Sequence, residues 1–115
     1  MLTPAAAENL QAGGQLASYQ CWATAYPLHE DCSIPLGSHG ATSPRLALRW
    51  VRERTSQITD QLDAAYAQPG RHWLTDEPEN ERALAYLAAG TAYQLTLYDD
   101  STRYVLVANP RGAAS

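Results

Sequence analysis

Residues 43–66 constrain the fold more than any other stretch, because they carry the signals of one long amphipathic helix. Ser43 can cap an N-terminal backbone N–H, and Pro44 suits the first helical position, where its missing N–H is not needed. Small and apolar positions then recur at steps of three and four residues, which places them on one helical face. These positions are Ala47, Val51, Thr55, Ile58, Leu62 and Ala65. Pro69-Gly70 is interpreted as the stop that follows.

The charges on this predicted helix run against its dipole. Four arginines lie in its N-terminal half, where the dipole disfavours cations, while Asp60 and Asp63 lie near its C-terminal end. The four are Arg45, Arg49, Arg52 and Arg54. Either Arg49 pairs with Glu53 and the others are solvated, or the arginines face an acidic surface in this chain or on a partner.

A second helix and a β-hairpin are predicted further along the chain. Asp76 and Glu79 form a capping box, and Gly90 is a suitable C-terminal stop. Residues 93–98 and 103–108 flank a turn at residues 99–102 and predict two antiparallel strands. The second strand is apolar on both faces, which is typical of a strand covered on both sides.

The N-terminal part of the chain is less regular. Residues 1–14 predict an arm or a short helix, and residues 15–26 alternate as a strand that ends at Pro27. Residues 27–42 contain Pro35, Gly37 and Gly40 and are interpreted as a long loop, while residues 109–115 are interpreted as a mobile tail. The pattern predicts one α+β domain over residues 1–115. Its sheet is three-stranded and mainly antiparallel, made of the N-terminal strand and the C-terminal hairpin, and it packs against two main helices.

Composition narrows the class of protein. The chain has 115 residues and a net charge of −4, so binding to nucleic acid is disfavoured. Alanine occurs 20 times while Lys and Phe are absent, a bias that fits a GC-rich bacterial or phage genome. The sequence lacks the pattern of a signal peptide and any apolar run long enough to span a membrane, so we expect a cytoplasmic protein whose two cysteines are reduced.

One local segment resembles an enzyme family. Gln15, followed six residues later by Cys21-Trp22-Ala23, is similar to the nucleophile region of papain-like cysteine peptidases. The resemblance implies that Cys21 is the nucleophile and Gln15 the oxyanion donor. His72 and Asn109 are the residues available as base and orienting group, but the strand that should supply the histidine contains none.

A second alternative is a small module whose fold is held together by a structural zinc ion. The candidate ligands are Cys21, His29, Cys32 and His39, which have the residue types of a tetrahedral zinc site. Their spacing is irregular and contains no C-x2-C or H-x3-H pair that would hold two ligands in one turn.

The remaining signals favour binding over catalysis, and no cofactor is predicted. Three Trp and seven Tyr supply amphipathic side chains that are enriched at interfaces, and the strand tyrosines predict one exposed aromatic sheet face. The favoured interpretation is a non-enzymatic protein that occludes a partner protein, as an inhibitor, immunity protein or adaptor would; a homodimer is left open. The predicted contact residues are the four helix arginines with His29, Glu30, Asp31 and His39 of the loop.

Overall fold

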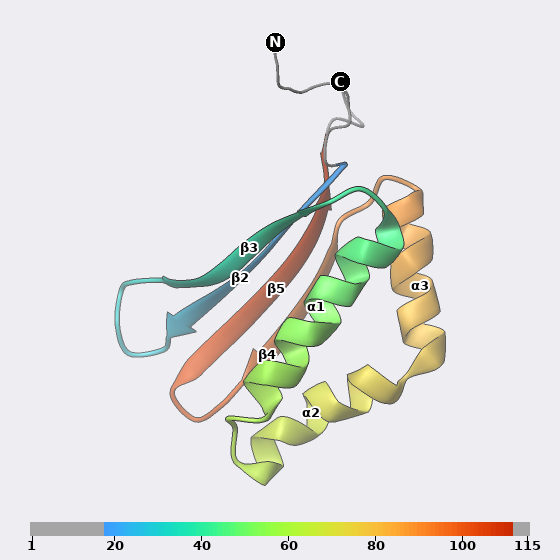
Figure 1. Ribbon diagram of the computed structural model, residues 1–115. Helices are drawn as coiled ribbons and strands as arrows, with labels where there is room; N and C mark the ends of the chain where they lie inside the picture. Colours follow the sequence, from blue (N-terminus) through green and yellow to red (C-terminus); the bar gives the residue numbers. More distant parts are fainter. Residues whose placement is uncertain (1–17, 112–115) are drawn as a thin grey trace.

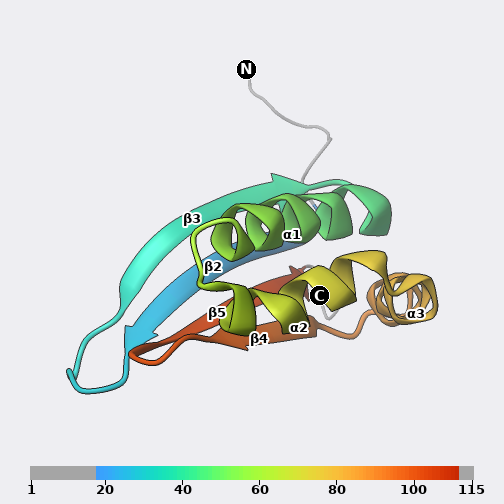
Figure 2. The same ribbon diagram turned by 90° about the horizontal axis from the view of Figure 1, so that it is seen from below.

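The computed structural model describes residues 18–111, which form one antiparallel sheet and a layer of three helices. The strands are β2 (Tyr19–Pro27), β3 (Ile34–Ala41), β4 (Tyr93–Tyr98) and β5 (Thr102–Pro110), in the order β3-β2-β5-β4. The helices are α1 (Pro44–Thr59), α2 (Ala64–Thr75) and α3 (Glu77–Ala88). All three lie against the same face of the sheet (Figures 1 and 2). The α+β class is therefore confirmed.

The predicted three-stranded sheet is wrong, because the segment interpreted as a loop contains a fourth strand. β3 pairs with β2 from Ala41 opposite Tyr19 to Ile34 opposite Ala25. A bulge at Leu36 shifts the register, and Gly37 beside it has a φ of 134°. Pro and Gly are tolerated at an edge strand and at a bulge, so residues that signal a loop in the sequence are compatible with this position.

The long predicted helix is in fact two helices. α1 ends at Thr59 and α2 begins at Ala64, with Pro69 and Gly70 inside α2 instead of after a stop. Arg71 of α2 folds back on the end of α1, donates to the Thr59 carbonyl at 3.4 Å and lies 3.5 Å from the Asp60 carboxylate. A cation at this position complements the C-terminal end of the α1 dipole.

The predicted helix starts and the hairpin are confirmed. The Ser43 side chain accepts a hydrogen bond from the Leu46 N–H at the start of α1, and the Asp76 side chain accepts one from the Glu79 N–H at the start of α3. Gly90 follows α3 with a φ of 85°, a conformation that favours glycine. β4 and β5 pair as an antiparallel hairpin.

The core lies between α1 and the two central strands. Ala47 and Val51 of α1 are buried against Cys21 of β2 and Leu106 of β5, and Leu87 of α3 closes the same cluster. Small residues at the contact, Ala23 and Ala108 among them, allow the helix to approach the sheet closely. The buried face of α1 therefore supplies the helical side of the core.

A chain of buried and half-buried hydrogen bonds joins the helices to β4. The Trp73 indole N–H donates to the Tyr93 hydroxyl at 2.8 Å, and that hydroxyl donates to the Glu79 carboxylate at 2.7 Å. Burial and the hydrogen bond to Glu79 raise the pKa of Tyr93 to about 12. The neutral Tyr93 hydroxyl is thus part of how α2, α3 and the sheet are held together.

Some expectations concern residues at the two ends of the chain. The predicted N-terminal arm or helix lies outside the described residues, as does the end of the predicted tail. The beginning of that tail, Asn109 and Pro110, belongs to β5. Within residues 18–111, no helix has the length and apolar character needed to cross a membrane.

Candidate binding surfaces

The four arginines that were predicted to form a contact face have different surroundings. Arg45 is exposed at the start of α1, and Arg49 lies 3.6 Å from Glu53, as one of the two interpretations expected. Arg52 is half-buried and donates to the Leu74 carbonyl and to Asn80. Arg54 donates to Gln57 at 2.9 Å and lies over the Trp50 ring. Arg52 therefore ties α1 to the other helices, while Arg54 is held on α1 beside Trp50.

The predicted loop residues also separate into two places. His29, Glu30 and Asp31 are exposed in the turn between β2 and β3, at one end of the sheet. His39 lies in β3 opposite Cys21, and its ring stacks on Trp50 of α1 at 6.3 Å between centroids.

Cys21 has the environment of a structural thiol. It lies within β2, is fully buried, and its Sγ is 3.8 Å from the Ala47 carbonyl. Burial raises the pKa of the Cys21 thiol to about 11. A papain-like nucleophile instead needs a helix N-terminus and a lowered pKa, because the thiolate is the reactive form.

The other residues of the peptidase resemblance do not gather around Cys21. Gln15 lies outside the described residues. His72 is exposed on α2, where it lies 3.7 Å from Asp76. Asn109 is opposite Gln20 in the register, on the face of the sheet away from Cys21.

The four candidate zinc ligands divide into two places: Cys21 and His39 lie opposite each other on β2 and β3, while His29 and Cys32 lie in the turn between these strands. Cys21 is buried beneath α1, while Cys32 is exposed in the turn after β2 and donates to the Glu30 carboxylate at 3.5 Å. Across residues 18–111, no three His, Cys, Asp or Glu side chains gather as metal ligands would.

The face of the sheet opposite the helices is a distinct surface, which we call the outer sheet face. Strand register assigns its residues, because side chains opposite one another in an antiparallel pair share a face. It comprises Gln20, Trp22, Thr24 and Tyr26 of β2, Pro35, Ser38 and Gly40 of β3, Gln94, Thr96 and Tyr98 of β4, and Arg103, Val105, Val107 and Asn109 of β5. No helix of the described chain covers this face (Figure 2).

The outer sheet face differs in charge from the rest of the molecule. It contains no Asp or Glu, although the chain carries a net charge of −4. The carboxylates of residues 18–111 lie instead in the helices, their junctions and the turns between strands. Arg103 stacks 4.6 Å from the Tyr26 ring centroid, and Arg111 donates to Gln20 at 3.0 Å, so two cations lie on or beside this face.

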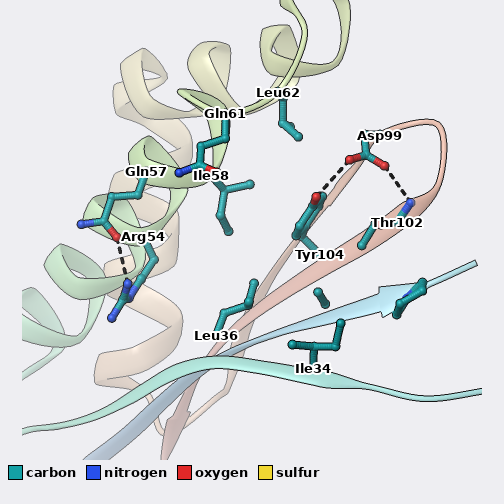
Figure 3. A pocket seen from close by; sticks show the side chains of 12 residues that line it. Ile34, Leu36, Arg54, Gln57, Ile58, Gln61, Leu62, Asp99, Thr102 and Tyr104 are labelled. Atoms are coloured by element: carbon teal, nitrogen blue, oxygen red, sulfur yellow. Dashed lines mark hydrogen bonds between the residues drawn. The ribbon is translucent and has the colours of Figure 1, made fainter.

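A second surface is a groove on the opposite, helix-bearing side of the sheet, which we call the α1 groove (Figure 3). It opens between the C-terminal half of α1 and the ends of β2, β3 and β5, with a volume of about 490 Å³. Its apolar lining includes Ala25, Ile34, Leu36, Ile58, Leu62 and Tyr104. Ile34 is 48% exposed there, so apolar surface remains open to solvent.

The two charged groups of the α1 groove lie at opposite ends (Figure 3). Asp99 accepts hydrogen bonds from the Ser101 and Thr102 N–H groups at 2.8 and 2.7 Å and from the Tyr104 hydroxyl at 2.9 Å. Burial alone would raise the pKa of Asp99, but these donors outweigh it and hold the pKa below its usual range. Arg54 has no carboxylate partner among residues 18–111.

Sequence reasoning anticipated one of these surfaces and missed the other. The strand tyrosines predicted an exposed aromatic sheet face: Tyr26 and Tyr98 lie on the outer sheet face, where Tyr98 is 53% exposed, whereas Tyr19, Tyr93 and Tyr104 lie on the helix side. The groove depends on β3, which was interpreted as a loop, and on the end of α1, which was predicted to continue. Ile34 and Leu36, flanking Pro35, were the available signal for a strand.

Comparisons with protein-family models, with curated proteins and with solved structures found no match for this chain. The composition and geometry of the two surfaces are therefore what point to a function.

Proposed function

We propose that this chain is a small non-enzymatic protein that binds a partner protein through its outer sheet face and thereby occludes part of the partner. A bacterial or phage inhibitor, immunity protein or adaptor would act in this way. The proposal rests mainly on one observation. The outer sheet face contains aromatic residues and no Asp or Glu, although the molecule as a whole is acidic.

The apolar side chains of this face support docking. Val105 and Val107 make β5 apolar on its outer side as well as on its helix side, a pattern typical of strands covered on both faces. Trp22 lies opposite Val107, and Tyr98 lies opposite Arg103. Trp, Tyr and Arg are the residue types that dominate binding energy at protein interfaces.

Charge indicates the chemistry of the partner. Arg103 and Arg111 have no carboxylate partner among residues 18–111, and a second copy of the same acid-free face would not supply one. A partner with an apolar centre and carboxylates at its rim would complement this surface. Single-stranded nucleic acid fits less well, because the net charge repels phosphates and Arg103 occupies one side of the Tyr26 ring that a base would need.

Site-specific photo-cross-linking tests the proposal and captures the partner in the same experiment. A benzophenone amino acid replaces Tyr98 on the outer sheet face, or Tyr86 on α3 as the matched control; the two tyrosines are 53% and 40% exposed. In the cells that make the protein, we expect a discrete protein adduct from position 98 and none from position 86. With the identified partner purified, Trp22→Ala should weaken binding about tenfold or more, whereas Tyr66→Ala on α2 should have little effect.

Several outcomes contradict this function. An adduct from position 86 alone would move the contact to the helices, and an adduct with a second copy would indicate a homodimer. A nucleic-acid adduct would replace the protein partner with another class of molecule. Tyr98→Ala serves as a second variant if Trp22→Ala unfolds, because the exposed Tyr98 contributes little to the core.

A further inference from the structure

The α1 groove combines an apolar lining with one cation that lacks an anionic partner in the described chain. Its volume of about 490 Å³ lies within the range of small-molecule sites. The ends of the groove differ in character, since Arg54 and Gln57 lie at one end and Asp99 and Thr102 at the other (Figure 3).

Asp99 already accepts hydrogen bonds from three residues at its end of the groove. Its Oδ1 accepts from the Ser101 and Thr102 backbone N–H groups, and its Oδ2 accepts from the Tyr104 hydroxyl. The carboxylate is thus engaged by the turn that it stabilises. Arg54, by contrast, donates to Gln57 alone among residues 18–111, so it is the charged group of the groove with the most unused hydrogen-bonding capacity.

Arg54 is held in place by several contacts. Its Nη1 donates to Gln57 Oε1 at 2.9 Å, and its Cζ lies 5.4 Å from the Trp50 ring centroid. Gly37 of β3 leaves room for the guanidinium, because a Cβ there would lie 2.9 Å from Arg54 Nη2. Most of the guanidinium N–H donors remain unused by residues 18–111, and their planar geometry suits a carboxylate.

We propose that the α1 groove binds a small amphipathic carboxylate. The carboxylate lies against Arg54, and the aliphatic tail lies along Leu36, Ile58 and Leu62 towards Tyr104. Charge complementarity selects the head group, and the apolar lining selects the tail.

This site is separate from the outer sheet face. Ala25 and Tyr104 of the groove point to the helix side of the sheet, whereas their neighbours Thr24 and Arg103 point to the other side. Failure of one proposal therefore leaves the other standing, and the two can be tested on the same purified chain.

Octanoate and 1-octanol are suitable probes, because they share the alkyl chain and differ in charge. Titration is followed by calorimetry and by intrinsic tryptophan fluorescence, to which Trp50 beside Arg54 contributes. We expect saturable octanoate binding, weaker binding of 1-octanol, and a loss of about tenfold or more in octanoate affinity on Arg54→Gln. Arg54→Gln should leave 1-octanol binding unchanged.

Two further variants sharpen the result. Arg49→Gln is the matched control, since Arg49 is on the same helix, pairs with Glu53 and does not line the groove. Ile34→Glu places a carboxylate on a half-exposed groove position and should weaken octanoate binding with little effect on folding. The proposal is overturned by absence of saturable octanoate binding, by equal affinity for octanoate and 1-octanol, or by equal effects of Arg54→Gln and Arg49→Gln.

Discussion

The Arg52 guanidinium donates to the Asn80 side-chain oxygen over 2.7 Å, and this bond links α1 to α3. The same nitrogen donates to the Leu74 carbonyl at 3.0 Å near the end of α2. Asn80 in turn donates to the Trp73 carbonyl. One arginine thus satisfies polar groups at the point where all three helices meet.

Replacing Arg52 should destabilise the fold although the residue belongs to a predicted surface patch. Arg52→Ala leaves Asn80 and the Leu74 carbonyl without this donor, and we expect a loss of roughly 2–3 kcal/mol in the free energy of unfolding. Arg49→Ala should change it by less than about 0.5 kcal/mol, because the Arg49–Glu53 pair is exposed. Urea denaturation followed by circular dichroism measures both. Equal losses would show that the half-buried hydrogen bonds of Arg52 add nothing to stability.

The two cysteines should differ sharply in reactivity. Cys21 is fully buried with its pKa raised to about 11, so iodoacetamide should not modify it in the folded protein near neutral pH. Cys32 is exposed and should be alkylated, more slowly than a free cysteine. Local desolvation and the Glu30 carboxylate raise its pKa, which lowers the thiolate fraction. Mass spectrometry of the alkylated protein locates the adduct. Rapid modification of Cys21 near pH 6 would instead support the interpretation of the chain as a cysteine hydrolase.

The fold should lose stability in alkaline solution partly through Tyr93. Its pKa is raised from an ordinary value of 10.0 to about 12, so its stabilising contribution is complete below pH 10 and is lost as the pH rises towards 12. A shift of that size corresponds to at most roughly 2–3 kcal/mol. Tyr93→Phe removes this titration, and its free energy of unfolding should fall less steeply than that of the native chain over this interval. Parallel pH profiles of the two proteins would rule out the effect.

Gly70 should resist substitution because α2 passes close to the end of α1. A Cβ at Gly70 would overlap the Thr59 methyl group and touch Leu97 of β4. Gly70→Ala gains helix propensity of about 1 kcal/mol, but we expect overpacking to outweigh it and leave a net loss of roughly 1–2 kcal/mol. Thr59→Ser removes the methyl and keeps the hydroxyl that donates to Ser56, so it should restore part of the loss. A double-mutant cycle with no coupling between the two sites would contradict this contact.

Local signals were enough to predict the start of α1, the helix α3 and the C-terminal hairpin. Ser43, Asp76 and Gly90 act within a few residues of their own positions, so a short window of sequence contains their effect. The spacing of Ala47 and Val51 likewise predicted that they lie on the buried face of the helix.

The elements that were missed depend on distant residues. β3 exists because β2 offers a partner and because the bulge beside Gly37 accommodates a glycine and a proline at the edge. At the break after Thr59 the end of α1 is contacted by Arg71 and Gly70, which belong to the following helix. The α1 groove arises from both of these features, so a site built on them could not be deduced from local pattern alone.

The position of β2 and β5 side by side at the centre of the sheet has a consequence for the order of folding. The β2–β3 and β4–β5 hairpins close over short spans of sequence, whereas the central pair joins strands separated by all three helices. Such a distant pairing carries a larger loop-closure entropy and forms late. During translation β2 therefore leaves the ribosome with one edge vacant, and that edge stays vacant until β5, the last strand of the described chain, is made.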